Sequence, residues 1–219
     1  MTRLRDLFRR QAPPAPIDPV PAPVESPLPV PAPFRLPDPA AGDALLAVAL
    51  GLAPGRRCLL TGDAPARLAR ACLALLQQGA ASALVAAPDP PRHADAMLRD
   101  EALRWGLMEV ATPLLERPPA GERGPQTYYL DCDRPADWWM RAALDEGDIA
   151  QRAGPLDLVV DFRSLGANPD PLARLRALAA TGAGELMLED APGEAEYWLD
   201  RVGFRRRGRR GTVLVARRR

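Results

Sequence analysis

The segment Leu156-Asp-Leu-Val-Val-Asp161 is a short apolar run that ends in an acidic residue. Its apolar residues are almost continuous, which is typical of a strand buried on both faces of a parallel sheet. Similar runs occur upstream at residues 57–61 and 82–87, and downstream at residues 185–188. We predict that these four segments form the inner strands of one sheet.

Helical patterns alternate with these strands. They cover residues 44–53, 66–78, 93–105, 138–149, 171–180 and 194–201, with a further strand predicted at residues 127–130. Such alternation indicates βαβ units with helices on both faces of a parallel sheet. Near the end, residues 202–204 and 212–216 are strand-like and are joined by a short arginine-rich turn, which requires an antiparallel pair. We therefore predict an α/β, Rossmann-like fold with a seven-stranded, mostly parallel sheet and an antiparallel last strand.

A proline-rich segment precedes this fold. Twelve prolines lie between Pro13 and Pro39, and proline fixes φ and lacks the amide donor that helices and sheets need. We predict a disordered, extended linker. The preceding residues 1–10 are basic, with apolar residues at helical spacing, and are interpreted as either a frayed end or an anchor for a membrane surface or a protein partner. The predicted domains are residues 1–41, the basic segment and linker, and residues 42–219, the α/β domain.

The composition excludes several kinds of chemistry. All 29 basic residues are arginines, so no lysine is available for a Schiff base or a P-loop. One histidine and three scattered cysteines do not make a zinc site or a disulfide framework, and the cysteines fit a reducing compartment. We expect a cytoplasmic protein with no transmembrane segment, because the longest apolar run is about half of the roughly 20 residues that cross a bilayer. Attachment to a membrane surface or a larger assembly is left open.

Four motifs follow one another in the α/β part. They are Leu52-Ala-Pro-Gly55 leading to Gly62, Leu156–Asp161 followed by Asn168-Pro-Asp-Pro171, Gly182-Ala-Gly184 leading to Leu188, and the two closing strands. In this order and spacing they resemble the class I S-adenosylmethionine-dependent methyltransferases. The resemblance spans the α/β part and implies S-adenosylmethionine as a cofactor, bound beside the ends of the first strands.

The resemblance places the cofactor's methionine part at the turn after the first strand. Gly62, Asp63 and Ala64 occupy the position of the family's glycine-rich motif, where glycines let the backbone approach the cofactor. This chain departs from the motif, because Leu60 replaces its acidic residue and alanines replace two of its glycines. The resemblance therefore implies either a working cofactor site or a degenerate one.

Four acidic residues complete the predicted site. Asp89 stands where the family's acidic residue accepts both ribose hydroxyls, with a strand-end cap as the structural alternative. Asp131 or Asp133 stands near the adenine position, although Asp133 also suits the N-cap of the next helix. Asp161 ends the fourth strand at the carboxyl edge, where ligands bind in open α/β sheets. It is the candidate catalytic base, with a capping or loop role as the alternative.

The last nineteen residues carry nine arginines and no acidic residue. Such a cluster predicts contact with a polyanion or an acidic protein, or else a solvated turn. The candidate polyanion-binding residues are Arg205, Arg206, Arg207, Arg209 and Arg210.

Three functions remain open from the sequence. The first is a methyltransferase that uses S-adenosylmethionine on an unidentified acceptor. The second is a catalytically inactive adaptor or assembly protein with a methyltransferase fold, a pseudoenzyme tethered through residues 1–41, which would also be the segment that binds a protein partner. The third is a nucleic-acid-binding module that works through the terminal arginines.

Overall fold

A computed structural model of the chain describes residues 37–86, 93–115, 136–137 and 154–219. The chain divides into residues 1–35 and a compact unit of residues 36–219, and every described residue lies in the second. The predicted proline-rich tail lies outside the described residues, so its disorder and its boundary at residue 41 stay predictions. The predicted strand at 127–130 and helix at 138–149 lie outside them as well.

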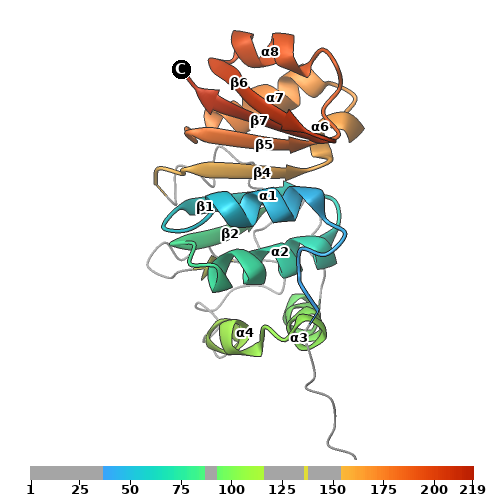
Figure 1. Cartoon of the computed structure of the whole chain (residues 1–219), viewed down its shortest axis with the longest axis vertical. Coiled ribbons are helices and arrows are strands. Elements are labelled where there is room, and N and C mark those ends of the chain that lie inside the picture. Colours follow the sequence, from blue (N-terminus) through green and yellow to red (C-terminus); the bar gives the residue numbers. More distant parts are fainter. Residues whose placement is uncertain (1–36, 87–92, 116–135, 138–153) are drawn as a thin grey trace, which may run out of the picture. The chain divides into compact units, whose positions relative to one another are not determined.

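The compact unit has one sheet with helices on both faces (Figure 1). Its strands are β1 (Arg57–Gly62), β2 (Ser82–Ala86), β3 (Ala136–Asp137), β4 (Leu158–Phe162), β5 (Glu185–Glu189), β6 (Phe204–Arg210) and β7 (Val213–Arg218). Its described helices are α1 (Ala44–Leu52), α2 (Pro65–Gln77), α3 (Ala94–Trp105), α4 (Met108–Leu115), α6 (Ser164–Ala167), α7 (Pro171–Ala180) and α8 (Ala195–Arg201).

The strands follow one another in the sheet in the order β3-β2-β1-β4-β5-β7-β6. The strands β1 to β5 pair in parallel, whereas β7 runs antiparallel to both of its neighbours, β5 and β6. Within the described residues β3 is a two-residue strand that pairs with Ala83 and Leu84 of β2. The α/β class, the mostly parallel sheet and the reversed last strand are thereby confirmed.

The central strands are buried on both faces. Leu60 of β1 and Val160 of β4 belong to a core shared with α1 to α4. Their neighbours Leu59 and Val159 belong to a second core, shared with α6 to α8. Successive residues of a strand point to opposite faces, so a strand that is covered on both sides needs an apolar residue at nearly every position. This explains the continuous apolar runs in the sequence.

The closing hairpin corrects one prediction. The sequence predicts a strand that ends at residue 204 and a turn made of arginines, whereas β6 extends from Phe204 to Arg210 and the turn lies at Gly211-Thr212. The five arginines predicted to lie in the turn are thus strand residues with exposed side chains. β6 is an edge strand, where charged side chains stay in solvent and also discourage another chain from adding to the sheet.

The ends of β1 and β4 approach each other closely. Gly62 is the register partner of Phe162, and a Cβ atom on Gly62 would lie 2.8 Å from the Phe162 carbonyl oxygen and 2.9 Å from its Cβ. Real Cβ atoms do not come so close to backbone atoms. Glycine at position 62 is therefore required by the packing of the two strands, whatever binds beside them.

The variant Gly62→Ala tests this packing requirement. We expect it to lower the free energy of unfolding by about 1–3 kcal/mol, because the added methyl group forces the ends of β1 and β4 apart. Urea denaturation measures the change. Gly51→Ala in α1 is the matched control, because no atom lies within 4 Å of its added Cβ and alanine favours the helix by up to about 1 kcal/mol. Equal stability of Gly62→Ala and the wild-type protein would contradict the prediction.

Candidate functional site

The turn between β1 and α2 lies at the carboxyl edge of the sheet, where ligands bind in open α/β folds. Gly62 ends β1, Asp63 is exposed and Ala64 is the N-cap of α2. No side chain caps α2, and its first residue, Pro65, has no N–H, so the Ala66 and Arg67 N–H groups of the first turn have no partner within the helix. The turn thus offers one carboxylate and several amide donors to a ligand that carries both kinds of charge.

The other predicted cofactor residues are outside the described part of the chain. Asp89 follows β2, which ends at Ala86 beside Thr61 of β1, so its strand leads to the same edge as Gly62. Asp131 and Asp133 precede β3 in the sequence. The roles of these three aspartates stay predictions.

Asp161, the candidate catalytic base, is fully buried. Its carboxylate accepts hydrogen bonds from the Ser164 hydroxyl and, at 3.0 Å, from the Leu165 amide in α6. The Arg174 guanidinium lies 3.9 Å away and donates to the hydroxyls of Ser164, at 2.9 Å, and Thr61, at 2.8 Å. These contacts favour the capping alternative, because both carboxylate oxygens are engaged and neither is exposed.

A group that the sequence analysis did not find lies at the same edge, and we call it the Arg67 cluster. Arg67, in the first turn of α2, donates to both carboxylate oxygens of Asp43 at 2.7 and 2.8 Å, and to both of Glu189 at 2.6 and 2.8 Å. Its guanidinium also lies over the Phe162 ring, 4.5 Å from the centroid. Arg70 adds a fourth charge, 3.0 Å from Asp43. The cluster joins α1, α2, β4 and β5.

Two members of the Arg67 cluster, Asp43 and Arg67, are held in their ionised forms. Burial alone would raise the pKa of Asp43, but hydrogen bonds from Arg67 and the Leu46 amide, together with the charges of Arg67 and Arg70, outweigh burial and lower it below 3.8. Burial would likewise lower the pKa of Arg67, but its hydrogen bonds to Asp43 and Glu189 raise it instead. Only a planar guanidinium can donate two bonds to each of two carboxylates, so lysine could not replace Arg67.

A second ion pair follows β4 and β5. Arg163 and Asp190 are joined at 2.8 Å, and both have left-handed backbone conformations, with φ of 66° and 50°. Such strain in residues other than glycine costs on the order of 1–3 kcal/mol and is found most often at functional sites. Asp190 was missed, although its place directly after the apolar run 185–188 could have pointed to it. No sequence pattern pointed to Arg67, because its partners lie 24 and 122 residues away along the chain.

The two cysteines among the described residues are not nucleophiles. Cys58 and Cys72 are buried thiols, and burial raises the pKa of each to about 12, so neither forms a nucleophilic thiolate at neutral pH.

None of the described helices is both long enough and apolar enough to cross a bilayer.

Comparisons with known proteins bear on the fold. No protein-family model and no curated protein matches the sequence. The pyocyanin biosynthetic protein PhzM is similar in structure, with a TM-score of 0.51 and 14% identity over 82% of this chain and 56% of that one. Two further similar structures are the ribosomal protein L11 methylase from Lactobacillus delbrueckii subsp. bulgaricus (TM-score 0.45, 14% identity, 80% of this chain and 77% of that one) and a SAM-dependent methyltransferase from Aquifex aeolicus (0.40, 15%, 83% and 88%).

The chain has the class I S-adenosylmethionine-dependent methyltransferase fold, as the sequence resemblance predicts. The low identities of 14% and 15% limit these likenesses to the fold, because one fold supports many functions. What the chain does must be argued from its own residues.

Replacing Arg67 tests whether the Arg67 cluster holds the edge together. We expect Arg67→Met to lower the free energy of unfolding by about 3 kcal/mol, because the buried carboxylates of Asp43 and Glu189 would lose the guanidinium that bonds both of them and keep only Arg70 and Arg163 nearby. Thermal or urea unfolding measures the loss. Arg176→Met, which removes an exposed arginine from α7, is the control and should change stability by less than about 0.5 kcal/mol. Equal losses in the two variants would contradict the role of Arg67.

The pH dependence of stability tests the state of Asp43. Its pKa in the folded protein lies below the ordinary 3.8, so its stabilisation is present above that value and is lost as the pH falls toward the folded-state pKa. Between pH 6 and pH 3, the wild-type free energy of unfolding should fall by about 1 kcal/mol more than that of Asp43→Asn, which keeps an N-cap without the charge. Parallel stability curves for the two proteins would show that Asp43 makes no such contribution.

Proposed function

We propose that the chain binds S-adenosylmethionine at the carboxyl edge of β1 and transfers its methyl group to an acceptor molecule. The observation that supports this function is the turn Gly62-Asp63-Ala64, which joins a buried central strand to an uncapped helix within a class I methyltransferase topology. The exposed Asp63 carboxylate and the free amides of this turn are suited to the ammonium and carboxylate groups of the cofactor's amino-acid part.

The residues of the turn would hold the cofactor, which when bound supplies an electrophilic methyl group on a positively charged sulfur. Asp63 would bind the ammonium group, and the Ala66 and Arg67 N–H groups, which follow Pro65 at the start of α2, would bind the carboxylate. Asp89, which follows β2, would accept the ribose hydroxyls. Each of these contacts fixes the cofactor's position, and fixed position is what an in-line displacement needs most.

An acceptor would approach from the ends of β4 and β5. The Asp190 carboxylate is 39% exposed and is held by Arg163 at 2.8 Å. In that position it would accept the acceptor's proton or a hydrogen bond from it, a role for which the buried Asp161 is less suited. Asp161 instead would orient the start of α6 through its bonds to Ser164 and Leu165.

A second candidate function is an inactive adaptor with the same fold. The observation that favours it is the Arg67 cluster, in which the Arg67 guanidinium donates to both oxygens of Asp43 and to both oxygens of Glu189. A site that satisfies its own charges has less to gain from a charged ligand. The alanines at positions 64 and 66, which add methyl groups to the turn, also favour the inactive adaptor.

Calorimetric titration with S-adenosylmethionine and S-adenosylhomocysteine separates the two functions. The methyltransferase proposal predicts binding in the micromolar range to the full chain. Asp63→Asn should weaken it about ten- to a hundredfold, because a hydrogen bond to a charged group contributes about 1.5–3 kcal/mol. Asp89→Ala should have a similar effect.

Asp100→Asn is the matched control, because Asp100 is an exposed carboxylate on α3, away from the β1–α2 turn, and its removal should leave the affinity unchanged. The absence of heat at millimolar concentrations of both compounds would overturn the methyltransferase proposal and favour the adaptor.

A further inference from the structure

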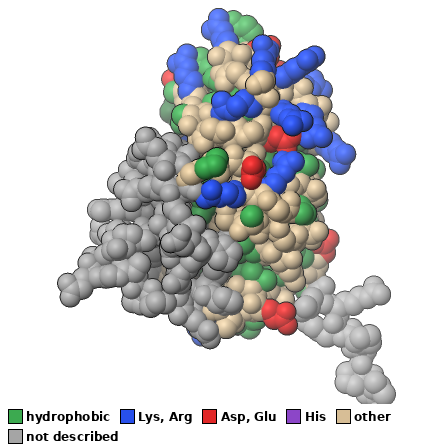
Figure 2. Space-filling model, turned by 90° about the vertical axis from the view of Figure 1, so that its left-hand side faces the viewer, with side chains coloured by type: hydrophobic (Ala, Val, Ile, Leu, Met, Phe, Trp, Pro, Cys, Tyr) green, Lys and Arg blue, Asp and Glu red, His purple; other side chains and the backbone are tan. Residues whose placement is uncertain are grey.

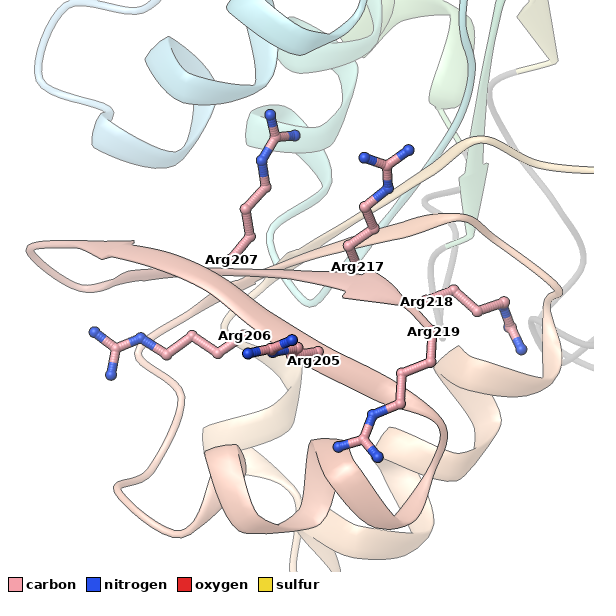
Figure 3. Close-up of a pocket in the computed structure, with 6 residues that line it drawn as sticks. All are labelled: Arg205, Arg206, Arg207, Arg217, Arg218 and Arg219. Carbon is pink, nitrogen blue, oxygen red and sulfur yellow. The ribbon is translucent and has the colours of Figure 1, made fainter.

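The β6–β7 hairpin carries a hollow lined only by arginines. Its volume is about 650 Å³, and its walls are Arg205, Arg206, Arg207, Arg217, Arg218 and Arg219. Figure 3 shows the six side chains spreading from the two strands, with Arg207 and Arg217 extending on the same side of the hairpin. In Figure 2, arginine side chains gather over the end of the molecule where Figure 1 places β6, β7 and α8.

The carboxylates near the hollow do not balance its charge. Arg206 pairs with Glu196 at 2.9 Å, Arg207 pairs with Glu185 at 2.7 Å, and Arg219 pairs with Asp200. Glu185 is shared with Arg56. Six guanidinium groups thus face three carboxylates, which leaves at least three positive charges uncompensated in this surface region of the described residues.

Two of these charges come from opposite positions on the two strands of the hairpin. Arg205 and Arg217 are direct register partners on the antiparallel pair, and each side chain is exposed. Arg217 is also the register partner of Glu185 on β5, but the Glu185 carboxylate is bonded to Arg56 and Arg207. Like charges that stand directly opposite one another destabilise a sheet. The pair therefore has a cost for folding, which anionic groups bound to the two guanidiniums would reduce.

An exposed aromatic side chain lies near this charge. Tyr197 of α8 is 60% exposed, and the Arg201 guanidinium lies 4.7 Å from the centre of its ring. The preceding residue, Glu196, is the one that pairs with Arg206 of β6, which fixes this part of α8 beside the hairpin. Alternation along the strands puts Arg206 on the face of the sheet that α8 covers, and puts Arg217 with its register partner Arg205 on the face of Val213 and Val215. Because β6 is the edge strand, a single strand of nucleic acid that passes over this edge can meet guanidiniums on both faces and stack a base on Tyr197.

The hollow is separate from the proposed cofactor site. Arg217, which lines the hollow, is the register partner of Glu185, the first residue of β5. The Arg67 cluster instead contains Glu189, the last residue of that strand. At about 3.3 Å per residue the two lie roughly 13 Å apart along β5, at opposite edges of the sheet. The hollow therefore does not serve the reacting part of a methyl acceptor.

We propose that the β6–β7 hairpin binds the phosphate backbone of single-stranded nucleic acid, with Arg205 and Arg217 each binding a phosphate at the edge strand and Tyr197 stacking on a base. Arginine is suited to this role because its planar fork donates two bonds to one phosphate. Arg207 lies two residues further along β6, at the register shift between Arg206 and Gly208, and its side chain extends on the same side of the hairpin as that of Arg217 (Figure 3), so a neighbouring phosphate can be met there.

Fluorescence anisotropy with a labelled RNA of about 16 nucleotides tests the proposal on the full chain. The variant Arg205→Thr/Arg217→Thr should bind about tenfold more weakly at 0.1 M salt, and its plot of log affinity against log salt should be less steep by about 1.4, or about 0.7 for each lost phosphate contact. Its free energy of unfolding should stay equal or rise, because the opposed charges are gone. Loss of binding with retained stability is the supporting result.

Arg99→Ser/Arg104→Ser removes the same charge from α3, at the far end of the sheet (Figure 1), and should leave the affinity within about twofold. Tyr197→Ala should weaken binding about fivefold or more without changing the salt slope, because stacking involves no counterion release. Calorimetric titration of the Arg205→Thr/Arg217→Thr variant with S-adenosylmethionine measures cofactor binding separately from RNA binding.

Three outcomes would overturn the proposal. The first is that the wild-type protein does not bind the RNA, and the second is that the Arg205→Thr/Arg217→Thr and Arg99→Ser/Arg104→Ser variants lose equal affinity. The third is that a polyglutamate peptide of matched charge displaces the RNA at equal concentration, which would instead assign the hollow to an acidic protein.

Discussion

The central strands β1 and β4 bury side chains on both of their faces, and most of the architecture follows from this constraint. Helices must cover both sides, so α1 to α4 form one layer and α6 to α8 the other. Polar chemistry is then confined to the two edges of the sheet and to its exposed edge strand. The β1–α2 turn and the Arg67 cluster lie at the carboxyl edge, while the arginine hollow lies at the opposite edge on β6 and β7.

The strands and pairings that depend on local sequence patterns could be predicted. The run Leu156–Asp161 indicates a strand buried on both faces, and β4 occupies Leu158–Phe162. The short connection after residue 204 requires an antiparallel pair, and β7 is antiparallel to β6. The boundary of β6 was predicted wrongly because five arginines suggest a turn, whereas on an edge strand their side chains reach solvent while their backbone pairs with β7.

Interactions between distant residues could not be predicted. Arg67, Asp43 and Glu189 carry no shared motif, and they meet only because α1, α2 and β5 converge at one edge. Gly62 was interpreted through cofactor binding, but its close contact is with Phe162 of β4, a neighbour 100 residues away that no local pattern reveals. The Arg205–Arg217 opposition likewise depends on the register of the hairpin.

We propose that the carboxyl edge of the sheet binds the cofactor and is distinct from the arginine hollow. Amide NMR of the isotope-labelled protein during addition of S-adenosylmethionine examines both edges in one experiment. We expect shifts of the amides of Asp63, Ala64 and the first turn of α2, whereas those of Arg205 and Arg217 should not move. Unchanged spectra at the β1–α2 turn, or shifts confined to the hairpin, would contradict it.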